Sequence, residues 1–385
     1  MKRVLIITNL FPDKFSPCSE VFVQKQVEEL SKSYAVRVIA TRFKYSLSVE
    51  QEDHKTYQVT YIYIPVIKYV HLSLMYFYRR YALPVIDKLI GEWQPDIIHV
   101  HDYRHVPELL LLHKCLGKYP IPRYLTAHNI RTHPVMARTF AFKWFYRLCL
   151  KQSYSGWKHI FTVNERIGRI ISQDVKITGF TNIGNAVGPV PEIESSSLDS
   201  FRKMLSNKSF NLISVGNLKY EKGFHILIDA ISRLISKNYN LQLFIVGKGA
   251  ERDKLLSDIK SKKLEKNVVL TGDLNNEIVR NLYSLFDAFV LSSYSETFGV
   301  VYIEAMYAGL PVVGIKGQGI DGVVRDGENG FLAKPRDVED LAAKIEYIIN
   351  NRESVRAVAT RGQSLIQDEY RIEQLIKKIT DVYEQ

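Results

Sequence analysis

Short runs of β-branched and other apolar residues alternate along the chain with longer segments whose apolar residues recur every three or four positions. The short runs are typical of buried strands and the longer period of amphipathic helices. In the first half the pattern predicts strands at Val4–Thr8, Ala35–Ala40, Tyr57–Ile64, Asp96–Val100, Tyr124–Ala127 and His159–Val163. In the second half it predicts strands at Leu212–Val215, Leu241–Val246, Val268–Thr271, Ala288–Leu291 and Pro311–Ile315. Helices are predicted between them, among others at Val21–Ser31, Phe224–Lys237, Glu251–Lys262 and Val338–Ile349.

The repeated pattern and the length predict two domains. A chain of 385 residues holds about two domains at roughly 100 to 200 residues each. Alternating strands and helices indicate an α/β protein with parallel sheets, and residues 185–197, rich in Gly, Pro and Ser, are interpreted as a linker. We expect domains at residues 1–188 and 189–368, followed by a helix within 369–385. Open parallel sheets bind ligands beyond the carboxyl ends of their strands, so the chemistry is sought in the loops that follow strands.

The composition is that of a globular protein. Hydrophobic residues make up 46% and charged residues 24%, which excludes a disordered or collagen-like chain. No run reaches the roughly 18 apolar residues that a membrane span needs, and the first nine residues are interpreted as a strand, not a signal peptide. The cysteines form no close pair and no metal-binding spacing, which favours a reducing compartment: they are Cys18, Cys115 and Cys149. We therefore expect a cytoplasmic protein.

The net charge of +11 is concentrated in the first half. Residues 109–164 hold nine Lys and Arg and no acid, and within them 139–151 interleaves aromatic residues with cations. Residues 75–81 show the same composition. Basic aromatic helices of this kind can lie on an anionic membrane surface, which we expect as a partner. Alternatively, the aromatic side chains are core and the cations a solvated face. No nucleic-acid-binding motif accompanies the charge, so nucleic acid is not expected as a partner.

Two carboxylates eight residues apart form the sharpest chemical pattern. Glu296 lies in a loop after a predicted strand, a helix is expected to begin near Phe298 and Gly299, and Glu304 falls inside that helix. If the spacing is largely helical, the two carboxylates lie roughly 12 Å apart. The helix N-terminus between them offers unpaired N–H groups that suit a phosphate. A ligand with hydroxyls at both ends and a diphosphate between them has this layout, as in a sugar nucleotide.

Other candidate residues follow strands in both halves. Lys222 lies in a loop that opens a helix and supplies a compact charge for a diphosphate, although surface Glu-Lys-Gly triplets are common. His128 follows a strand and is either functional or a hydrogen-bonded structural histidine. His99, His101 and His105 are not expected to bind a metal, because strand-end histidines more often serve as hydrogen-bonding partners. Residues 317–322 formally match Gly-x-Gly-x-x-Gly, but no clear helix follows, so a dinucleotide site is not expected.

The Glu296 to Glu304 segment resembles the Glu-x7-Glu signature of the retaining GT-B glycosyltransferases of family 4. The resemblance covers nearly the whole chain. It includes the segments Leu243–Glu251, Val268–Asp273 and Arg325–Leu332 in the second half, and Phe11–Pro12, Ser19–Gln26, Ile97–Asp102 and Thr126–His128 in the first. It implies two Rossmann-like doubly wound domains facing across a cleft, an acceptor-side N-terminal domain, a donor-binding C-terminal domain, and a C-terminal helix that returns to the first domain.

The resemblance also implies roles for particular residues. Glu296 would bind the donor sugar hydroxyls, Glu304 the ribose hydroxyls and Lys222 the diphosphate, while His128 would line the reaction centre. The implied catalytic residues are His128, Lys222 and Glu296, and the implied donor-binding residues are Gly216, Asn217, Lys222, Gly272, Glu296, Phe298, Gly299, Val300 and Glu304. The chain departs from the family at Asn217, where an arginine is usual, and at Gly322, where an acid is often found.

The resulting prediction is a metal-independent hexosyltransferase. It would move a sugar with retention from a UDP- or GDP-sugar to a glycan, which we expect to be lipid-linked and part of a bacterial surface polysaccharide. No two aspartates show the Asp-x-Asp spacing of metal-dependent transferases, so no metal and no cofactor are expected. The expected location is the inner face of the plasma membrane. The alternatives are a soluble transferase that makes a small glycoside and a catalytically inactive subunit that binds sugar nucleotides.

Overall fold

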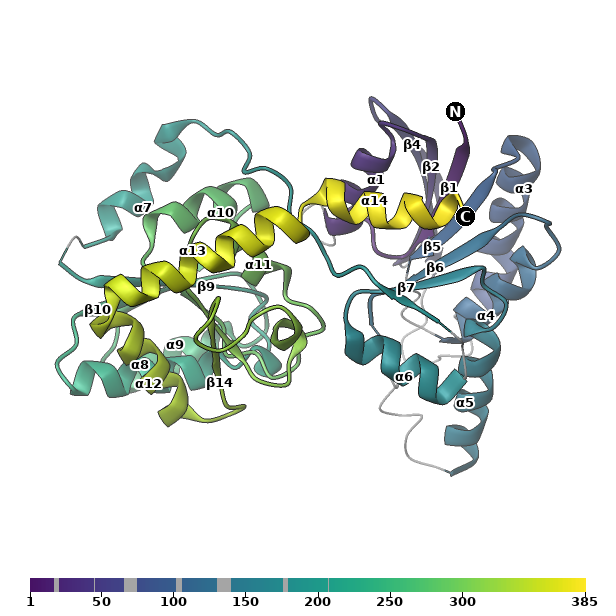
Figure 1. Cartoon of the computed structure of the whole chain (residues 1–385). Helices are drawn as coiled ribbons and strands as arrows, with labels where there is room; N and C mark the ends of the chain where they lie inside the picture. Colours follow the sequence, from purple (N-terminus) through teal and green to yellow (C-terminus); the bar gives the residue numbers. More distant parts are fainter. Residues whose placement is uncertain are drawn as a thin grey trace. The chain divides into compact units, whose positions relative to one another are not determined.

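The chain folds into two compact units, each built on one twisted sheet (Figure 1). The computed structural model describes residues 1–16, 21–44, 46–65, 75–101, 106–129, 140–175, 179–206 and 208–385. The first unit comprises Met1–Gly184 together with Ile372–Gln385, and the second comprises Asn185–Arg371. Two parallel-sheet α/β domains are therefore confirmed.

In the described part of the first unit, eight strands form one sheet in the order β3-β4-β2-β1-β5-β6-β7-β8. The strands are β1 (Arg3–Thr8), β2 (Ala35–Lys44), β3 (Ser48–Asp53), β4 (Tyr57–Pro65), β5 (Ile97–His101), β6 (Arg123–Ala127), β7 (His159–Thr162) and β8 (Thr181–Asn182). Every pair is parallel except β3 with β4. The accompanying helices are α1 (Val21–Leu30), α3 (Leu83–Trp93), α4 (Val106–Leu116), α5 (Phe140–Tyr154), α6 (Glu165–Val175) and α14 (Ile372–Tyr383), with a short π-helical turn at Tyr78–Ala82.

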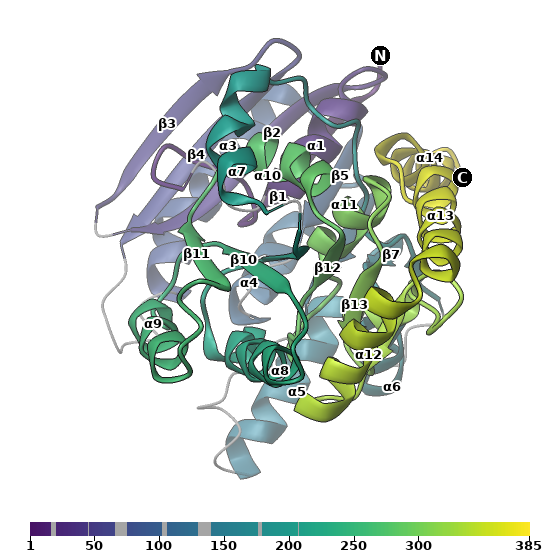
Figure 2. The same ribbon diagram turned by 90° about the vertical axis from the view of Figure 1, so that its left-hand side faces the viewer.

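In the second unit, six parallel strands lie in the order β11-β10-β9-β12-β13-β14. They are β9 (Phe210–Val215), β10 (Leu241–Val246), β11 (Val268–Gly272), β12 (Ala288–Val290), β13 (Val312–Ile315) and β14 (Phe331–Ala333). The helices are α7 (Asp199–Met204), α8 (Phe224–Ser236), α9 (Arg252–Ser261), α10 (Asn276–Leu282), α11 (Val300–Tyr307), α12 (Val338–Asn350) and α13 (Arg352–Glu369). Helices α8, α9 and α12 cover one face of this sheet, and α10, α11 and α13 cover the other (Figure 2).

The buried central strands explain why the pattern of the sequence was informative. Every residue of β5 and β12 is buried, as expected for parallel strands covered on both faces. Three strands were not predicted. β3 is polar and largely exposed, β8 has two residues and β14 has three, so none shows a readable apolar period.

The boundary between the units lies four residues before the predicted one. Residues 185–189 pack on the second unit, because the Val187 N–H donates to the Tyr370 carbonyl (2.9 Å) and the Arg280 guanidinium donates to the carbonyls of Gly188 (2.6 Å) and Pro189 (2.7 Å). At the other end, α13 runs to Glu369 and α14 begins at Ile372. Helix α14 packs on α1 and belongs to the first unit.

Within the described residues, none of the helices is both long enough and apolar enough to cross a membrane.

Candidate functional site

The second unit brings together Lys222 and Glu296, two of the candidate charged residues of the sequence. Lys222 follows β9 and Glu296 follows β12, and these strands are neighbours in the sheet. The Lys222 ammonium forms an ion pair with Glu296 Oε2, and the two side chains are 19% and 14% exposed. The pair therefore lies at the carboxyl edge of the sheet, where open parallel sheets bind ligands.

Hydrogen bonds lock the loops that carry this pair together. Ser292 Oγ donates to the Gly223 carbonyl (2.7 Å), the Tyr294 N–H to the Glu221 carbonyl (3.1 Å) and the Tyr294 hydroxyl to the Tyr220 carbonyl (3.0 Å). Gly223 has a φ of 69°, and a Cβ there would lie 2.3 Å from the Ser292 carbonyl oxygen. Glycine is therefore required for the close approach that places Lys222 beside Glu296.

The N-terminus of α11 begins directly after the Glu296 loop. Its N-cap is Gly299, with a φ of 86°, and no side chain caps it. Phe298 and Gly299 are buried and Val300 is half-buried. The first N–H groups of a helix have no partner within the helix, so this end favours an anion. Because α11 begins only at Val300, half of the Glu296–Glu304 spacing is not helical, and the roughly 12 Å expected from a helical rise does not apply.

The loop after β13 fixes the backbone at Glu296. The Glu296 N–H donates to Gln318 Oε1 (3.2 Å), and the Gly319 N–H donates to the Glu296 carbonyl (3.0 Å). A Cβ at Gly319 would lie 2.2 Å from the Thr297 carbonyl oxygen. Residues 319–322 form a short 3₁₀ turn and no longer helix, which is why the formal Gly-x-Gly-x-x-Gly match is not followed by a dinucleotide-type helix.

Glu304 occupies a more enclosed position than Glu296. It is 6% exposed and accepts a hydrogen bond from Asn276 Nδ2 of α10 (3.2 Å). Burial, followed by the nearby Glu304 carboxylate, raises the pKa of Tyr283 well above its ordinary value. The second acid of the pair is thus oriented by a neighbouring helix from within the unit.

The remaining donor-side candidates lie at the ends of the adjacent strands. A Cβ at Gly216 would lie 3.8 Å from Lys222 Cδ, so Gly216 adjoins the ion pair, and Asn217 beside it is exposed. The Gly247 N–H donates to the carbonyl of Gly272 (2.8 Å). The predicted glycines thus lie at the carboxyl ends of β9 and β11.

The predicted His128 lies in the first unit, in a buried cluster of histidines. Its Nε2 shares a hydrogen bond with His101 Nδ1 (3.1 Å), and Nδ1 has no partner among the described residues. Nearby, His99 Nε2 lies 2.7 Å from Thr126 Oγ1 and His99 Nδ1 lies 2.5 Å from the Tyr383 hydroxyl. Burial lowers the pKa of His101 to about 3 and the pKa of His128 well below its ordinary value.

These histidines are therefore neutral at physiological pH. His105 lies outside the described residues, and no group of three potential metal ligands occurs in the part of the chain that the structure describes.

Comparison with known proteins identifies the family. The model "Glycosyl transferases group 1" matches residues 197–365, and "Glycosyltransferase Family 4" matches residues 19–187. This chain belongs to the family 4 glycosyltransferases of the GT-B fold.

The names of similar proteins indicate several different transferase activities. Glycogen synthase of Mycobacterium tuberculosis is 25% identical over 76% of this chain and 69% of its own length. The lipopolysaccharide core biosynthesis glycosyltransferase LpsE of Rhizobium meliloti is 32% identical over 45% of this chain and 48% of its own. The structure of Anabaena HepE in complex with UDP-glucose covers 100% of both chains, with a TM-score of 0.75 and 17% identity. The structural likeness supports the fold.

The family assignment makes the chain a glycosyltransferase that takes its sugar from a nucleotide-sugar donor. Within this glycosyltransferase, the structure adds residues that the sequence did not single out. Asn276 contacts Glu304, Gln318 holds the Glu296 backbone, and Tyr294 joins the two loops. Each contact joins segments that follow different strands, so no local pattern in the sequence could indicate it.

Proposed function

We propose that this glycosyltransferase moves a hexose from a UDP- or GDP-sugar, with retention of the anomeric configuration, to a lipid-linked glycan of a bacterial surface polysaccharide. The observation that carries the proposal is the Lys222–Glu296 pair beside the N-terminus of α11. A cation, a carboxylate and unpaired helix amides lie at one edge of a parallel sheet. This combination suits the diphosphate and the hydroxyls of a sugar nucleotide.

The ion pair indicates how the donor would be bound. Lys222 exchanges its carboxylate partner for the donor diphosphate, and Glu296 then accepts hydrogen bonds from sugar hydroxyls. The mostly buried position of both side chains strengthens these interactions relative to water. Glu304, oriented by Asn276, is the proposed partner of the ribose hydroxyls.

The proposed chemical step needs no protein nucleophile. The bond between the anomeric carbon and the diphosphate oxygen breaks while the acceptor oxygen forms its bond on the same face of the sugar. The departing diphosphate takes the acceptor proton. Lys222 and the first amides of α11 stabilise the negative charge that develops on the leaving group, which is the role that a metal plays in other transferases. His128 is proposed to line the reaction centre as a neutral side chain.

Of the two basic aromatic segments, we propose that α5 contacts the membrane more extensively than residues 75–81 do. Trp144 and Leu148 lie one helical turn apart on α5 and are 65% and 40% exposed. In the segment 75–81, Tyr78 is fully buried, so part of this aromatic run is core, whereas Tyr76 is 63% exposed. We propose that Trp144 and Leu148 of α5, with the exposed Lys151, rest on the anionic inner face of the plasma membrane.

A panel of UDP-, GDP- and ADP-sugars, assayed for slow donor hydrolysis and for the anomer of the released sugar, tests the proposal. Hydrolysis of one donor class with retention, unchanged by EDTA, is the expected result. Release of the inverted anomer, or activity abolished by EDTA and restored by a divalent cation, would contradict the proposed mechanism. The similarity to glycogen synthase favours a second candidate function, a soluble glucan-extending transferase. Transfer to a soluble glucan in preference to a lipid-linked acceptor would support it.

A further inference from the structure

A second edge of functional interest lies in the first unit, where β1, β2 and β4 end together. Residues 9–16 follow β1, Lys44 is the last residue of β2, and it pairs in register with Pro65 at the end of β4. Carboxyl ends of parallel strands are the ligand-binding edge of an open α/β sheet. The proposed donor chemistry does not use this edge.

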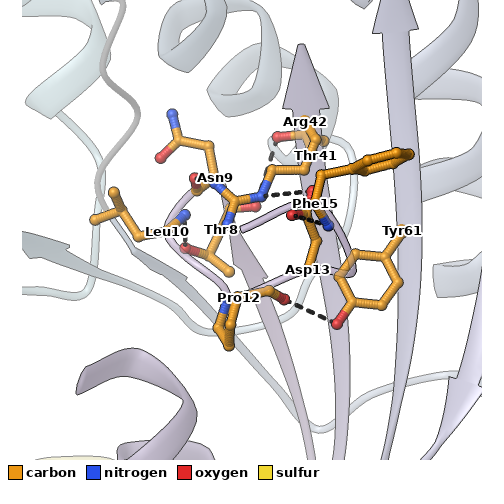
Figure 3. A network of polar contacts seen from close by, with 9 residues as sticks. All are labelled: Thr8, Asn9, Leu10, Pro12, Asp13, Phe15, Thr41, Arg42 and Tyr61. Carbon is orange, nitrogen blue, oxygen red and sulfur yellow. Dashed lines mark hydrogen bonds and ion pairs between the residues drawn. The ribbon is translucent and has the colours of Figure 1, made fainter. Parts of the chain in front are cut away.

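A buried polar network fixes the loop at this edge (Figure 3). The Asp13 side chain is fully buried, its Oδ1 accepts the Phe15 N–H (3.1 Å), and its Oδ2 lies 3.7 Å from Arg42 Nε. Arg42 Nη1 donates to the Asn9 carbonyl (3.1 Å) and the Tyr61 hydroxyl to the Pro12 carbonyl (2.9 Å). A buried ion pair contributes little net stability compared with apolar packing. Its clearest effect here is to hold the loop in one conformation.

The loop held in this way presents an aromatic ring to solvent. Phe15 is 59% exposed, and its ring packs perpendicular to that of the buried Tyr63 with ring centroids 5.7 Å apart. Lys44 Nζ lies 4.1 Å and Lys14 Nζ 5.3 Å from the centre of the Phe15 ring. An exposed phenyl ring on a rigid support suits the apolar face of a pyranose ring.

The charges around Phe15 are not balanced. Lys14 forms an ion pair with Glu50 (2.7 Å). Lys44 has no carboxylate within 4 Å among the residues that the structure describes. The edge therefore combines an aromatic ring with a cation, Lys44, that is not paired with any acid of the described residues. A ligand with a sugar ring and one negative group would satisfy both.

We propose that the first unit binds an acidic saccharide at this edge, with a sugar ring on Phe15 and its carboxylate or phosphate group on Lys44. As the subsite for the acceptor glycan, this inference rests on the proposed function and gives the acceptor a chemical class. Asp13 and Arg42 act as positioning residues, because they hold the loop that presents Phe15.

Titration calorimetry of the full chain with three hexasaccharides tests the proposal. One alternates glucuronate and N-acetylglucosamine, the second is its carboxyl-reduced neutral form, and the third is that neutral form with a terminal 6-phosphate. At least one acidic form should bind ten times more tightly than the neutral form, and the tighter of the two identifies the source of the charge. Equal binding of all three, or binding of none, would overturn the proposal.

Variants locate the binding to this edge. Lys44→Glu should weaken binding of the acidic form at least tenfold, and Phe15→Ala should weaken the binding of acidic and neutral forms alike. Lys55→Glu is the matched control, since Lys55 is exposed in the turn before β4, at the opposite end of that strand, and changes the net charge equally. An equal loss in Lys44→Glu and Lys55→Glu would show long-range electrostatics and no site.

Donor hydrolysis by the wild-type protein separates this inference from the proposed function. Hydrolysis without charge-dependent saccharide binding would remove the inference alone. Saccharide binding without hydrolysis of any donor would remove the proposed function and leave the binding edge in place.

Discussion

The two units place their ionisable groups differently at the carboxyl edges of their sheets. In the second unit, Lys222 and Glu296 form an ion pair that retains some exposure. In the first unit, His99, His101 and His128 are buried and kept neutral by burial. A partly exposed pair can exchange partners when a ligand arrives, whereas a buried neutral cluster mainly shapes its surroundings. We therefore propose charge stabilisation as the role of the pair in the second unit, and a fixed, uncharged environment as the role of the buried histidines in the first.

Removing the ammonium group of Lys222 should have the largest effect on catalysis. Lys222→Ala is expected to lower turnover by roughly 10²–10³-fold, because no ammonium group then stabilises the negative charge that develops on the leaving diphosphate. Steady-state assays with the donor identified by the hydrolysis panel measure this. Lys219→Ala, three residues away and exposed, is the matched control and should retain at least half of the wild-type rate. Equal activity of both variants would contradict the proposed role of Lys222 in stabilising the leaving group.

The histidine cluster makes a contrasting prediction about stability. An unfolded histidine takes up a proton near pH 6.5, whereas folded His101 does so only near pH 3. Between these values the unfolded state binds more protons, so the free energy of unfolding should fall as the pH drops below 6.5. The slope is about 1.4 kcal/mol per pH unit for each buried histidine. The contribution of these histidines to stability is fully present above pH 6.5.

Urea unfolding at several pH values, monitored by tryptophan fluorescence, can measure this slope for the first structural unit alone. The tryptophans Trp93, Trp144 and Trp157 all lie in the first unit. His101→Gln should reduce the slope between pH 5 and 6.5. Glu108→Gln should change the slope in the opposite direction over an overlapping range, because burial raises the pKa of Glu108 to about 8 and the stability from that group falls as the pH rises from 4.5 to 8. An unchanged slope in His101→Gln would show that this histidine charges in the folded state.

The sequence predicted those features whose residues all lie within one continuous segment. Strands β1, β9 and β10 are rich in apolar residues, and each lies within two residues of its prediction. The Glu-x7-Glu segment likewise contains its own loop, helix start and second acid. Contacts between loops were not predictable, since Asn276 with Glu304 and Gln318 with Glu296 join residues 28 and 22 positions apart. Nothing in the local pattern of either partner specifies the other.

Gly223 allows the loop after β9 to approach the loop after β12, and its replacement tests whether this close approach requires glycine. Gly223→Ala places a Cβ against the Ser292 carbonyl at a positive φ, and it should destabilise the second unit by about 1–3 kcal/mol and weaken donor binding. Circular dichroism should show a lower melting temperature, while the tryptophan transition of the first unit should change less. Gly322→Ala, where a Cβ meets nothing within 4 Å, is the control and should leave stability nearly unchanged. Equal destabilisation by both variants would mean that the close approach is not what requires glycine.

The smallest expected effect concerns helix α5 of the first unit and its proposed contact with a membrane. Replacing both Trp144 and Leu148 by Ala removes two exposed apolar side chains of α5 but leaves Lys151 in place. Cosedimentation with anionic liposomes should fall several-fold, since apolar burial and charge attraction both contribute to interfacial binding. Tyr347→Ala changes an aromatic side chain of similar exposure in the second unit and should not alter cosedimentation. If wild-type protein stays in the supernatant even at low salt, Trp144 and Leu148 belong to a solvated surface, and the result favours the alternative of a soluble acceptor.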